Sequence, residues 1–178
     1  MKYAMRHISA LLASVIISAC AATPGKVSQT KPVDKLNLQQ GVALKGYDSV
    51  AYFSEGAPAA GDAGISYQWN GAAWRFSSQE HRAAFMSDPA HYAPQYGGYC
   101  AFAVSRGTTA DADPDQWAIV DGKLFVNNNA FAKKLWDQDR PGNIVAGDAN
   151  WPLIPKRPLA TGDRTPDVSR SAPAADPM

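Results

Sequence analysis

The sequence predicts an α+β domain made of two related units, each a β-hairpin followed by a helix. Asn70-Gly71 and Asp121-Gly122 are dipeptides that tolerate the positive φ angles of a two-residue hairpin turn, and apolar and aromatic residues flank both. A segment with helical character follows each hairpin. The turns lie 51 positions apart (121 − 70), as do Phe85 and Trp136, and the spacing leaves both duplication and coincidence open.

Residues 1–19 are predicted to be a secretory signal peptide and are set apart from the fold. Lys2 and Arg6 form a positively charged start, and an apolar run from Ile8 to Ile17 follows. This run is too short to span a bilayer as a permanent helix. The next residues, up to Cys20, resemble the bacterial lipobox, in which the cysteine thiol is lipidated. The alternative is an ordinary signal peptide in which Cys20 occurs by chance.

Lipidation of Cys20 predicts a protein that is attached to a membrane surface without crossing it. Ala21, in place of an aspartate, predicts sorting to the outer membrane, with the domain on the periplasmic face of the cell envelope. Residues 20–38 are polar and typical of a flexible tether. Residues 155–178 carry almost no large apolar side chain and are predicted to be a disordered tail, which leaves residues 39–154 as the folded domain.

The first elements of this domain are predicted to be short. Residues 41–53 mix apolar and aromatic residues around a glycine break, which predicts a short strand or turn and then a short aromatic element. Residues 54–64 are rich in Gly, Ala and Pro and predict a loop. Residues 65–69 and 72–76 form the arms of the first hairpin.

A helix is predicted directly after this hairpin. Ser77 is placed to accept a hydrogen bond from the backbone N–H of Glu80, which is the pattern of a capping box. Asp88-Pro89 ends the helix and can cap a short turn through His91, and Pro94 stops that turn.

The second half repeats this order. Gly97-Gly98 allow a tight backbone path into an apolar interior run within residues 95–107, and residues 108–116 predict a polar loop. Residues 117–120 and 123–126 are the arms of the second hairpin.

A helix over residues 130–139 is predicted after the second hairpin, with a cap from residues 127–129. We expect one side of it to carry Phe131, Leu135 and Trp136. A final short helix before Trp151-Pro152 is expected to close the core.

The composition excludes some functions. The 178 residues carry a formal net charge of +1, so no charge excess indicates nucleic acid as a partner. The chain has two cysteines; with Cys20 lipidated, Cys100 is the only thiol left and no intramolecular disulfide can form. No recognised catalytic signature occurs, and we expect a protein that is not an enzyme.

Six blocks follow one another along residues 40–154: YDSVAYF, the hairpin ending WRF, SSQEHRAAF, SDPAHYAPQYGGYCA, VDGKLFVNNN and PGNIVAGDANWP. Together they resemble the exported YHS-domain proteins. The resemblance implies a fold related to the treble-clef, metal-binding modules. In the metal-binding members, one Cys lies near the start and a Phe-Cys-Ser-x-x-Cys segment enters the helix.

The sequence departs from that pattern at the ligand positions. Ala51 stands where the first Cys is expected, and Ser77 and His81 replace the two later ones. A closed structural zinc site needs four Cys or His side chains, whereas the predicted domain has only Cys100, His81 and His91. A structural zinc site is therefore not expected.

A smaller site for a soft metal ion is the leading functional hypothesis. His81 lies one turn before Phe85 and so faces inward, and Cys100 lies in an apolar run that can approach this face. These donors, with Met86 and His91 as further candidates, suit copper(I), or else zinc. The membrane, a metal ion or another envelope protein are the expected partners.

Each candidate ligand also has a purely structural interpretation. His81 can be a hydrogen-bonded, partly buried histidine, and His91 a solvated one. Met86 can fill the core, and Cys100 can be an inert buried thiol.

Two other functional classes stay open. Cys100 can be a nucleophile if a histidine lowers its pKa, although no spacing in the sequence demands this. The domain can also bind a partner or small ligand without catalysis, if some of its many aromatic side chains form a surface. The alternative, which is favoured for most of them, is that these aromatic side chains fill the core. The aromatic candidates for that surface are Tyr47, Tyr52, Trp69, Trp74, Tyr96, Tyr99 and Trp117.

Overall fold

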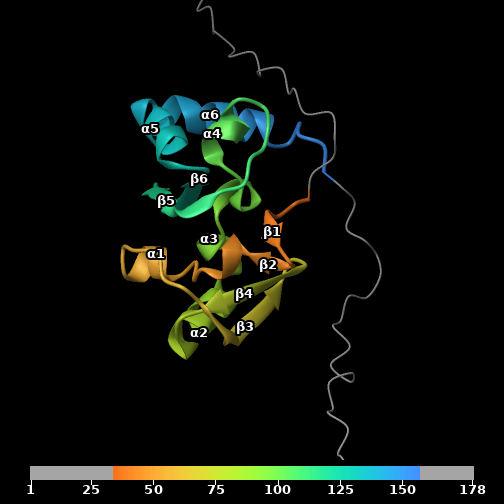
Figure 1. Ribbon diagram of the computed structural model, residues 1–178, viewed down its shortest axis with the longest axis vertical. Coiled ribbons are helices and arrows are strands. Elements are labelled where there is room, and N and C mark those ends of the chain that lie inside the picture. Colours follow the sequence, from red (N-terminus) through yellow and green to blue (C-terminus); the bar gives the residue numbers. More distant parts are fainter. Residues whose placement is uncertain (1–33, 157–178) are drawn as a thin grey trace, which may run out of the picture.

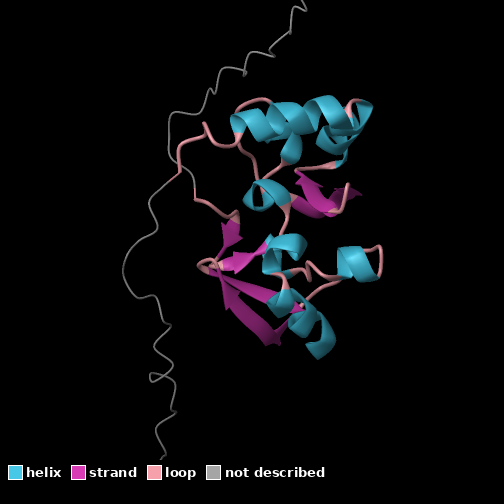
Figure 2. Ribbon diagram, turned by 180° about the vertical axis from the view of Figure 1, so that it is seen from behind, coloured by secondary structure: helices cyan, strands magenta, loops and turns pink. Residues whose placement is uncertain are grey.

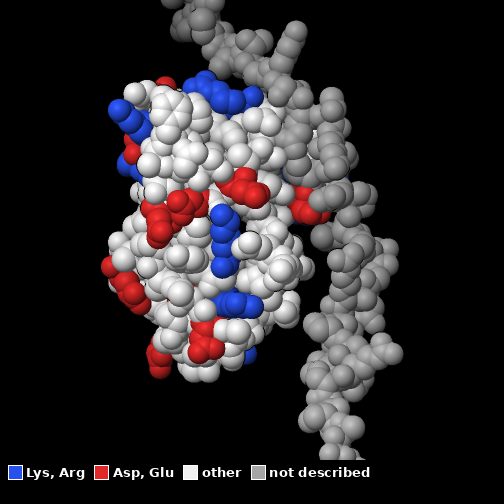
Figure 3. Space-filling model, in the orientation of Figure 1, with Lys and Arg blue, Asp and Glu red and all other residues white. Residues whose placement is uncertain are grey.

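The computed structural model describes residues 34–156, in which two sheets and helices α1 to α6 form an α+β fold (Figure 1). The predicted signal peptide, Cys20, the start of the tether and nearly all of the predicted tail lie outside these residues. Within residues 34–156, no helix has the length and apolar character needed to cross a membrane. On the face shown in Figure 3, basic and acidic side chains are interspersed.

The first half of the domain is built around a four-stranded sheet of order β1-β2-β4-β3. Its elements are β1 (Leu38–Gln39), β2 (Val42–Ala43), the 3₁₀ helix η1 (Leu44–Gly46), α1 (Ala51–Ser54), β3 (Asp62–Trp69), β4 (Ala72–Phe76), α2 (Gln79–Ser87) and α3 (Pro89–Tyr92). β3 and β4 form the predicted hairpin. β2 pairs with β4 in parallel through Val42 and Ala73, a pairing that the sequence did not predict.

The second half contains a two-stranded sheet covered by helices, which Figure 2 shows from behind. Its elements are η2 (Gln95–Gly98), α4 (Ala101–Ser105), β5 (Asp113–Val120), β6 (Lys123–Asn127), α5 (Ala130–Gln138) and α6 (Arg140–Asn150). β5 and β6 form the second predicted hairpin, and α6 is the predicted closing helix.

The two hairpins match position for position. Their turns have positive φ at both residues, 52° and 79° at Asn70-Gly71 and 50° and 71° at Asp121-Gly122, as type I′ turns require. The strand pairing of both hairpins is interrupted at the same place. In the first hairpin the break lies between the pairs Asp62↔Phe76 and Ser66↔Arg75. In the second it lies between Asp113↔Asn127 and Trp117↔Val126. Each of these positions in the first hairpin corresponds to the position 51 residues later in the second.

The helices and caps repeat as well. Ser78 and Asn129 each cap a nine-residue helix by accepting from the backbone N–H three residues later. Asp88 (φ −150°, ψ 74°) and Asp139 (φ −149°, ψ 71°) then cap the next helix. The same 51-residue correspondence holds before the hairpins. Lys45 and Tyr96 both have a left-handed backbone conformation (φ 53°, ψ 22° and φ 55°, ψ 31°), which is unusual for residues other than glycine. We call residues 44–88 the first unit and residues 95–139 the second unit.

Each unit has its own apolar core, and a third cluster joins them. Phe85 is fully buried in the first unit against Trp74 and Phe76, and Trp136 is fully buried in the second against Phe125. The joining cluster contains Leu44, Tyr52, Ala112, Leu124 and Val126. Tyr52 also donates a hydrogen bond to the Pro114 carbonyl across this junction (3.0 Å), and burial raises its pKa.

Five expectations about local structure are wrong. The first is the loop predicted over residues 54–64, because β3 already begins at Asp62. The helix cap is Ser78 and not Ser77, because Ser77 is bonded to a distant carboxylate described below. Leu36, which was assigned to the tether, is only 8% exposed and packs into the first core. β5 takes up the end of the predicted 108–116 loop. Phe131 is 70% exposed, so only part of the expected face of α5 is buried.

Candidate functional site: a cleft between the two units

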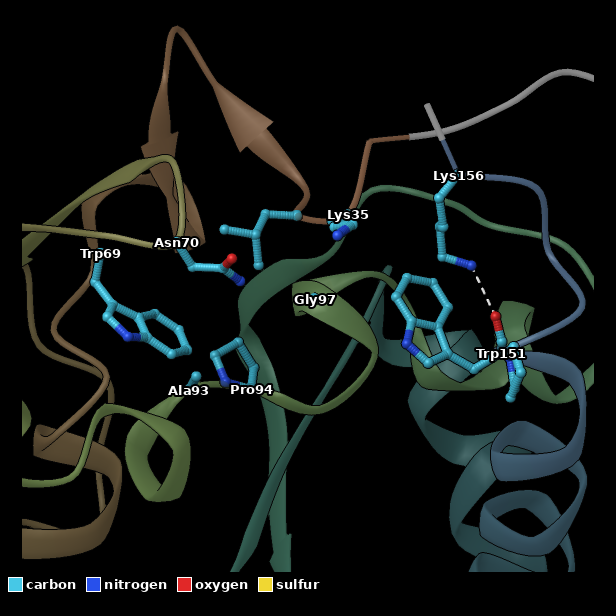
Figure 4. Close-up of a pocket in the computed structure, with 10 residues that line it drawn as sticks. Lys35, Trp69, Asn70, Ala93, Pro94, Gly97, Trp151 and Lys156 are labelled. Carbon is cyan, nitrogen blue, oxygen red and sulfur yellow. Dashed lines mark hydrogen bonds between the residues drawn. The ribbon is translucent and has the colours of Figure 1, made fainter. Parts of the chain in front are cut away.

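A cleft with a cavity volume of about 400 Å³ opens where the first unit and Gly97 of the second unit meet the segments at both ends of the described chain. This volume is in the range of small-molecule sites. Figure 4 shows Trp69 and Asn70 on one side, Trp151 and Lys156 on the other, and Gly97 between them. The lining consists of Lys35, Leu36, Trp69, Asn70, Ala93, Pro94, Gly97, Trp151, Pro152 and Lys156.

Trp69 forms one wall of the cleft and is held by the first core. Its ring packs edge-on against Trp74 and Phe85, with centroid separations of 5.7 and 5.8 Å. The indole N–H of Trp74 also donates to the Trp69 carbonyl at 3.1 Å. Because both the ring and the backbone of Trp69 are fixed, this wall is preformed.

Trp151 forms the opposite wall, directly after α6. Its ring centroid lies 6.0 Å from those of Tyr96 and Tyr99, so the second unit supports it. Lys156 lies over this ring with its Nζ 3.7 Å from the centroid, and donates to the carbonyls of Trp151 (2.7 Å) and Ile154 (2.6 Å). Partial burial lowers the pKa of Lys156, because desolvation disfavours its charged form.

The charge of the lining favours an anion. Lys35 and Lys156 are both in the lining, and no Asp or Glu is among the ten residues. An anionic group near Lys156 would compensate the desolvation of its ammonium group. The tryptophans supply flat apolar surface beside these cations.

Gly97 lies between the two walls, where the N-terminal segment crosses it. The backbone N–H of Asn37 donates to the Gly97 carbonyl (2.8 Å), and the side-chain amide of Asn37 donates to the Gly98 carbonyl (3.2 Å). Gly97 has a positive φ of 62°, and a Cβ there would overlap the carbonyl oxygen of Lys35. Glycine is therefore required both by the backbone conformation and by the close approach of the chain.

Gly97→Ala is expected to destabilise the protein by about 3 kcal/mol, because it combines backbone strain with a clash against backbone. Gly122→Ala is the matched control, since Gly122 also has a positive φ (71°) but a Cβ there would meet nothing within 4 Å. We expect the control to cost only about 1 kcal/mol. Urea denaturation measures both values, and hydrogen exchange at the Asn37 N–H reports the loss of the local contact. Equal costs for the two variants would contradict the close approach at Gly97.

His81, the first predicted metal ligand, lies in a hydrogen-bonded group within the first unit. Its side chain is 15% exposed, and its Nδ1 lies 2.6 Å from Asp48 Oδ2. Its Nε2 lies 3.0 Å from Ser54 Oγ and 3.7 Å from Glu55 Oε1. Ser77 Oγ, 3.2 Å from Nδ1, donates to the same Asp48 oxygen at 2.7 Å. The structural interpretation of His81 as a hydrogen-bonded, partly buried histidine is confirmed.

Cys100 lies in the second unit, with different neighbours. It is 1% exposed, and its Sγ lies 3.8 Å from Asn127 Oδ1. Figure 1 shows α2, which carries His81, and α4, which follows Cys100, in opposite halves of the domain. Of the interpretations left open for Cys100, burial is the one that this exposure supports, whereas no contact of Cys100 with His81 is observed.

The other predicted ligands lie at the surface. His91 is exposed and packs against Phe53, with ring centroids 4.9 Å apart. Met86 is 44% exposed, so the interpretation of Met86 as a core residue is wrong. Across residues 34–156, no three His, Cys, Asp or Glu side chains form a group that could hold a metal ion. Cys20 lies outside the described residues.

Comparisons with protein-family models, with curated proteins and with solved structures found no match for this chain. The resemblance to YHS-domain proteins therefore stays a prediction.

The sequence analysis missed one key residue in the hydrogen-bonded group around His81 and one in the cleft. Asp48 was not singled out within the block YDSVAYF, although a carboxylate within an apolar run is a signal for a buried, hydrogen-bonded acid. Lys156 was assigned to the tail, and no signal in the sequence indicates that it returns to Trp151.

Proposed function

We propose that the domain binds a small organic anion with a flat apolar body in the cleft between Trp69 and Trp151. The observation that supports this most directly is the combination of two tryptophan walls and two lysines in one cavity of about 400 Å³ without a lining carboxylate. Apolar walls with a few convergent polar groups are typical of small-molecule sites. The proposal is a specific form of the non-catalytic binding module predicted from the sequence.

We place this function ahead of soft-metal binding. A metal ion needs several donors that converge, and the described residues offer no group of three His, Cys, Asp or Glu side chains. Cys100 has Asn127 beside its thiol, and the ring nitrogens of His81 contact oxygen atoms of side chains.

We also propose that the chain is an envelope lipoprotein of the periplasmic face of the outer membrane, lipidated at Cys20. The support is the sequence alone: the charged and apolar start, the lipobox-like residues before Cys20 and the Ala21 that follows. In this arrangement the cleft would open beside the first described residues, because Lys35 and Leu36 line it.

Calorimetric titration of the full chain with 2-naphthoate, and with uncharged 2-naphthylmethanol, tests the binding proposal. We expect the anion to bind with 1:1 stoichiometry and about tenfold more tightly than the alcohol, since a tenfold ratio is about 1.4 kcal/mol, within the range of a charge-assisted contact. Lys156→Met should remove most of this preference. Lys123→Met, an exposed lysine outside the cleft, is the control.

Cys100→Ala separates the ligand and metal hypotheses. Binding of 2-naphthoate should survive this substitution, because Cys100 does not line the cleft. Failure of both naphthalene probes to bind would contradict the proposed function. Stoichiometric binding of copper(I) that is lost in both Cys100→Ala and His81→Ala would instead support the soft-metal function.

A further inference from the structure

The group formed by Asp48, His81 and Ser54 has the geometry of an acid–base–nucleophile triad. Asp48 Oδ2 lies 2.6 Å from His81 Nδ1, and His81 Nε2 lies 3.0 Å from Ser54 Oγ. Both distances are within the range expected for a nucleophile, its base and the group that orients the base. We propose that Ser54 is a nucleophile activated by His81, with Asp48 as a positioning residue, and that it accepts acyl groups from esters with good leaving groups.

Asp48 is suited to hold the imidazole in one tautomer. The residue is fully buried, and its carboxylate accepts from the Val50 N–H (2.9 Å), the Ser77 N–H (2.8 Å) and the Ser77 hydroxyl (2.7 Å). These bonds fix the carboxylate beside Nδ1, so that His81 donates its Nδ1 proton there. Nε2 is then the basic nitrogen, and it faces Ser54.

Ser54 is the accessible member of the group. It is exposed at the end of α1, so a substrate can approach its hydroxyl from solvent. The hydroxyl also lies 3.1 Å from the Val50 carbonyl, which competes with Nε2 for its proton. Glu55 Oε1, 3.7 Å from Nε2, would stabilise the imidazolium formed when the proton moves to His81.

The second unit forms the same hairpin and helix without this group. The positions 51 residues after Asp48, Ser54 and His81 are Tyr99, Ser105 and Ala132. Ala132 receives the same helix cap from Asn129 that His81 receives from Ser78, so the helix forms without an imidazole there. The triad is therefore an addition specific to the first unit.

The reaction balances with water as the second substrate. Ser54 Oγ forms a bond to the acyl carbon while its proton moves to His81 Nε2. The bond to the leaving oxygen then breaks, and that oxygen takes the proton from Nε2. Water attacks the resulting ester of Ser54 in the same way and releases the carboxylic acid. Ser54 ends a short helix, where carbonyl groups project, so the helix does not stabilise an oxyanion; this is why only activated esters are expected to react.

Labelling of the full chain with a fluorophosphonate tests the proposal, because this probe transfers its phosphonyl group to an activated serine and loses fluoride. Ser87 is an internal control: it is also exposed near a helix end, and its hydroxyl also donates to a preceding carbonyl (Ala84, 2.6 Å), but it has no hydrogen bond to a histidine among the described residues. We expect Ser54 to be labelled at least about a hundredfold faster than Ser87, as read by peptide mass spectrometry.

Variants identify the roles within the group. His81→Ala should reduce labelling of Ser54 by about a hundredfold, and added imidazole should restore part of it. Asp48→Asn should reduce it while circular dichroism shows that the variant is folded. p-Nitrophenyl acetate should release about one equivalent of p-nitrophenol in a burst that Ser54→Ala abolishes. Labelling of Ser54 no faster than Ser87 in the unmodified protein, or labelling unaffected by His81→Ala, would overturn the proposal. Neither outcome bears on ligand binding in the cleft.

Discussion

Phe85→Ala in α2 is expected to lower the free energy of unfolding by about 3–5 kcal/mol. Phe85 is fully buried at the centre of the first core, with its ring centroid 4.9 Å from that of Trp74 and 5.1 Å from that of Phe76. Alanine would leave a cavity that these rings cannot close without moving. Since small domains have total stabilities of about 5–15 kcal/mol, the loss would be a large part of the whole.

The corresponding residue of the second unit gives the comparison. Trp136→Ala should cost a similar amount, because Trp136 is also fully buried and packs on Phe125 (5.3 Å). Phe131→Ala is the matched control on the same helix, since Phe131 is 70% exposed, and it should change stability by less than about 0.5 kcal/mol. Urea denaturation followed by near-ultraviolet circular dichroism measures all three. A Phe131 effect as large as that of Phe85 would contradict the assignment of the two cores.

Asp48→Ala is expected to cost about 3–5 kcal/mol, the second-largest effect. The substitution removes the acceptor of two backbone N–H groups, one hydroxyl and the imidazole, in a place where the carboxylate is fully buried. Each buried donor left without a partner costs about 1–3 kcal/mol. The loss would loosen α1 from α2, because Asp48 links the two through Val50 and His81.

Asp62→Ala is the control for this effect. Asp62 Oδ1 accepts from the Gly64 N–H at 2.7 Å, two residues along, in the same way that Asp48 Oδ1 accepts from the Val50 N–H, but Asp62 is exposed. We expect it to cost less than about 1 kcal/mol. His81→Ala should lie between the two, since three donors to Asp48 remain. If chemical denaturation showed Asp48→Ala to be no less stable than Asp62→Ala, the network would not stabilise the fold.

The secondary structure followed the sequence closely where local chemistry decides it. Both type I′ turns, the helix after each hairpin and the Asp88 cap were predicted, because these features depend on residues within a few positions of one another. The error at Ser77 has a physical reason. Two adjacent serines can both cap a helix, and Asp48, 29 positions away, bonds to the first of them.

The candidate sites were predicted only in part. The sequence singled out His81 and included Trp69 among the aromatic candidates, but it paired His81 with Cys100 and a metal ion. In the structure His81 instead lies between Asp48 and Ser54, and Trp69 faces a cleft that Trp151 and Lys156 complete. Spacing along the chain does not specify which distant side chains converge.

The sequence by itself determined the α+β class, the two hairpin–helix units and their 51-residue relationship, because turn dipeptides, caps and apolar periodicity act locally. Only the tertiary structure decided that Leu36 belongs to the core, that β2 joins β4 in parallel, and that Gly97 lies beneath the backbone of Lys35. These contacts join segments far apart in the chain. They form where one packing arrangement both buries apolar surface and pairs the buried backbone N–H and C=O groups.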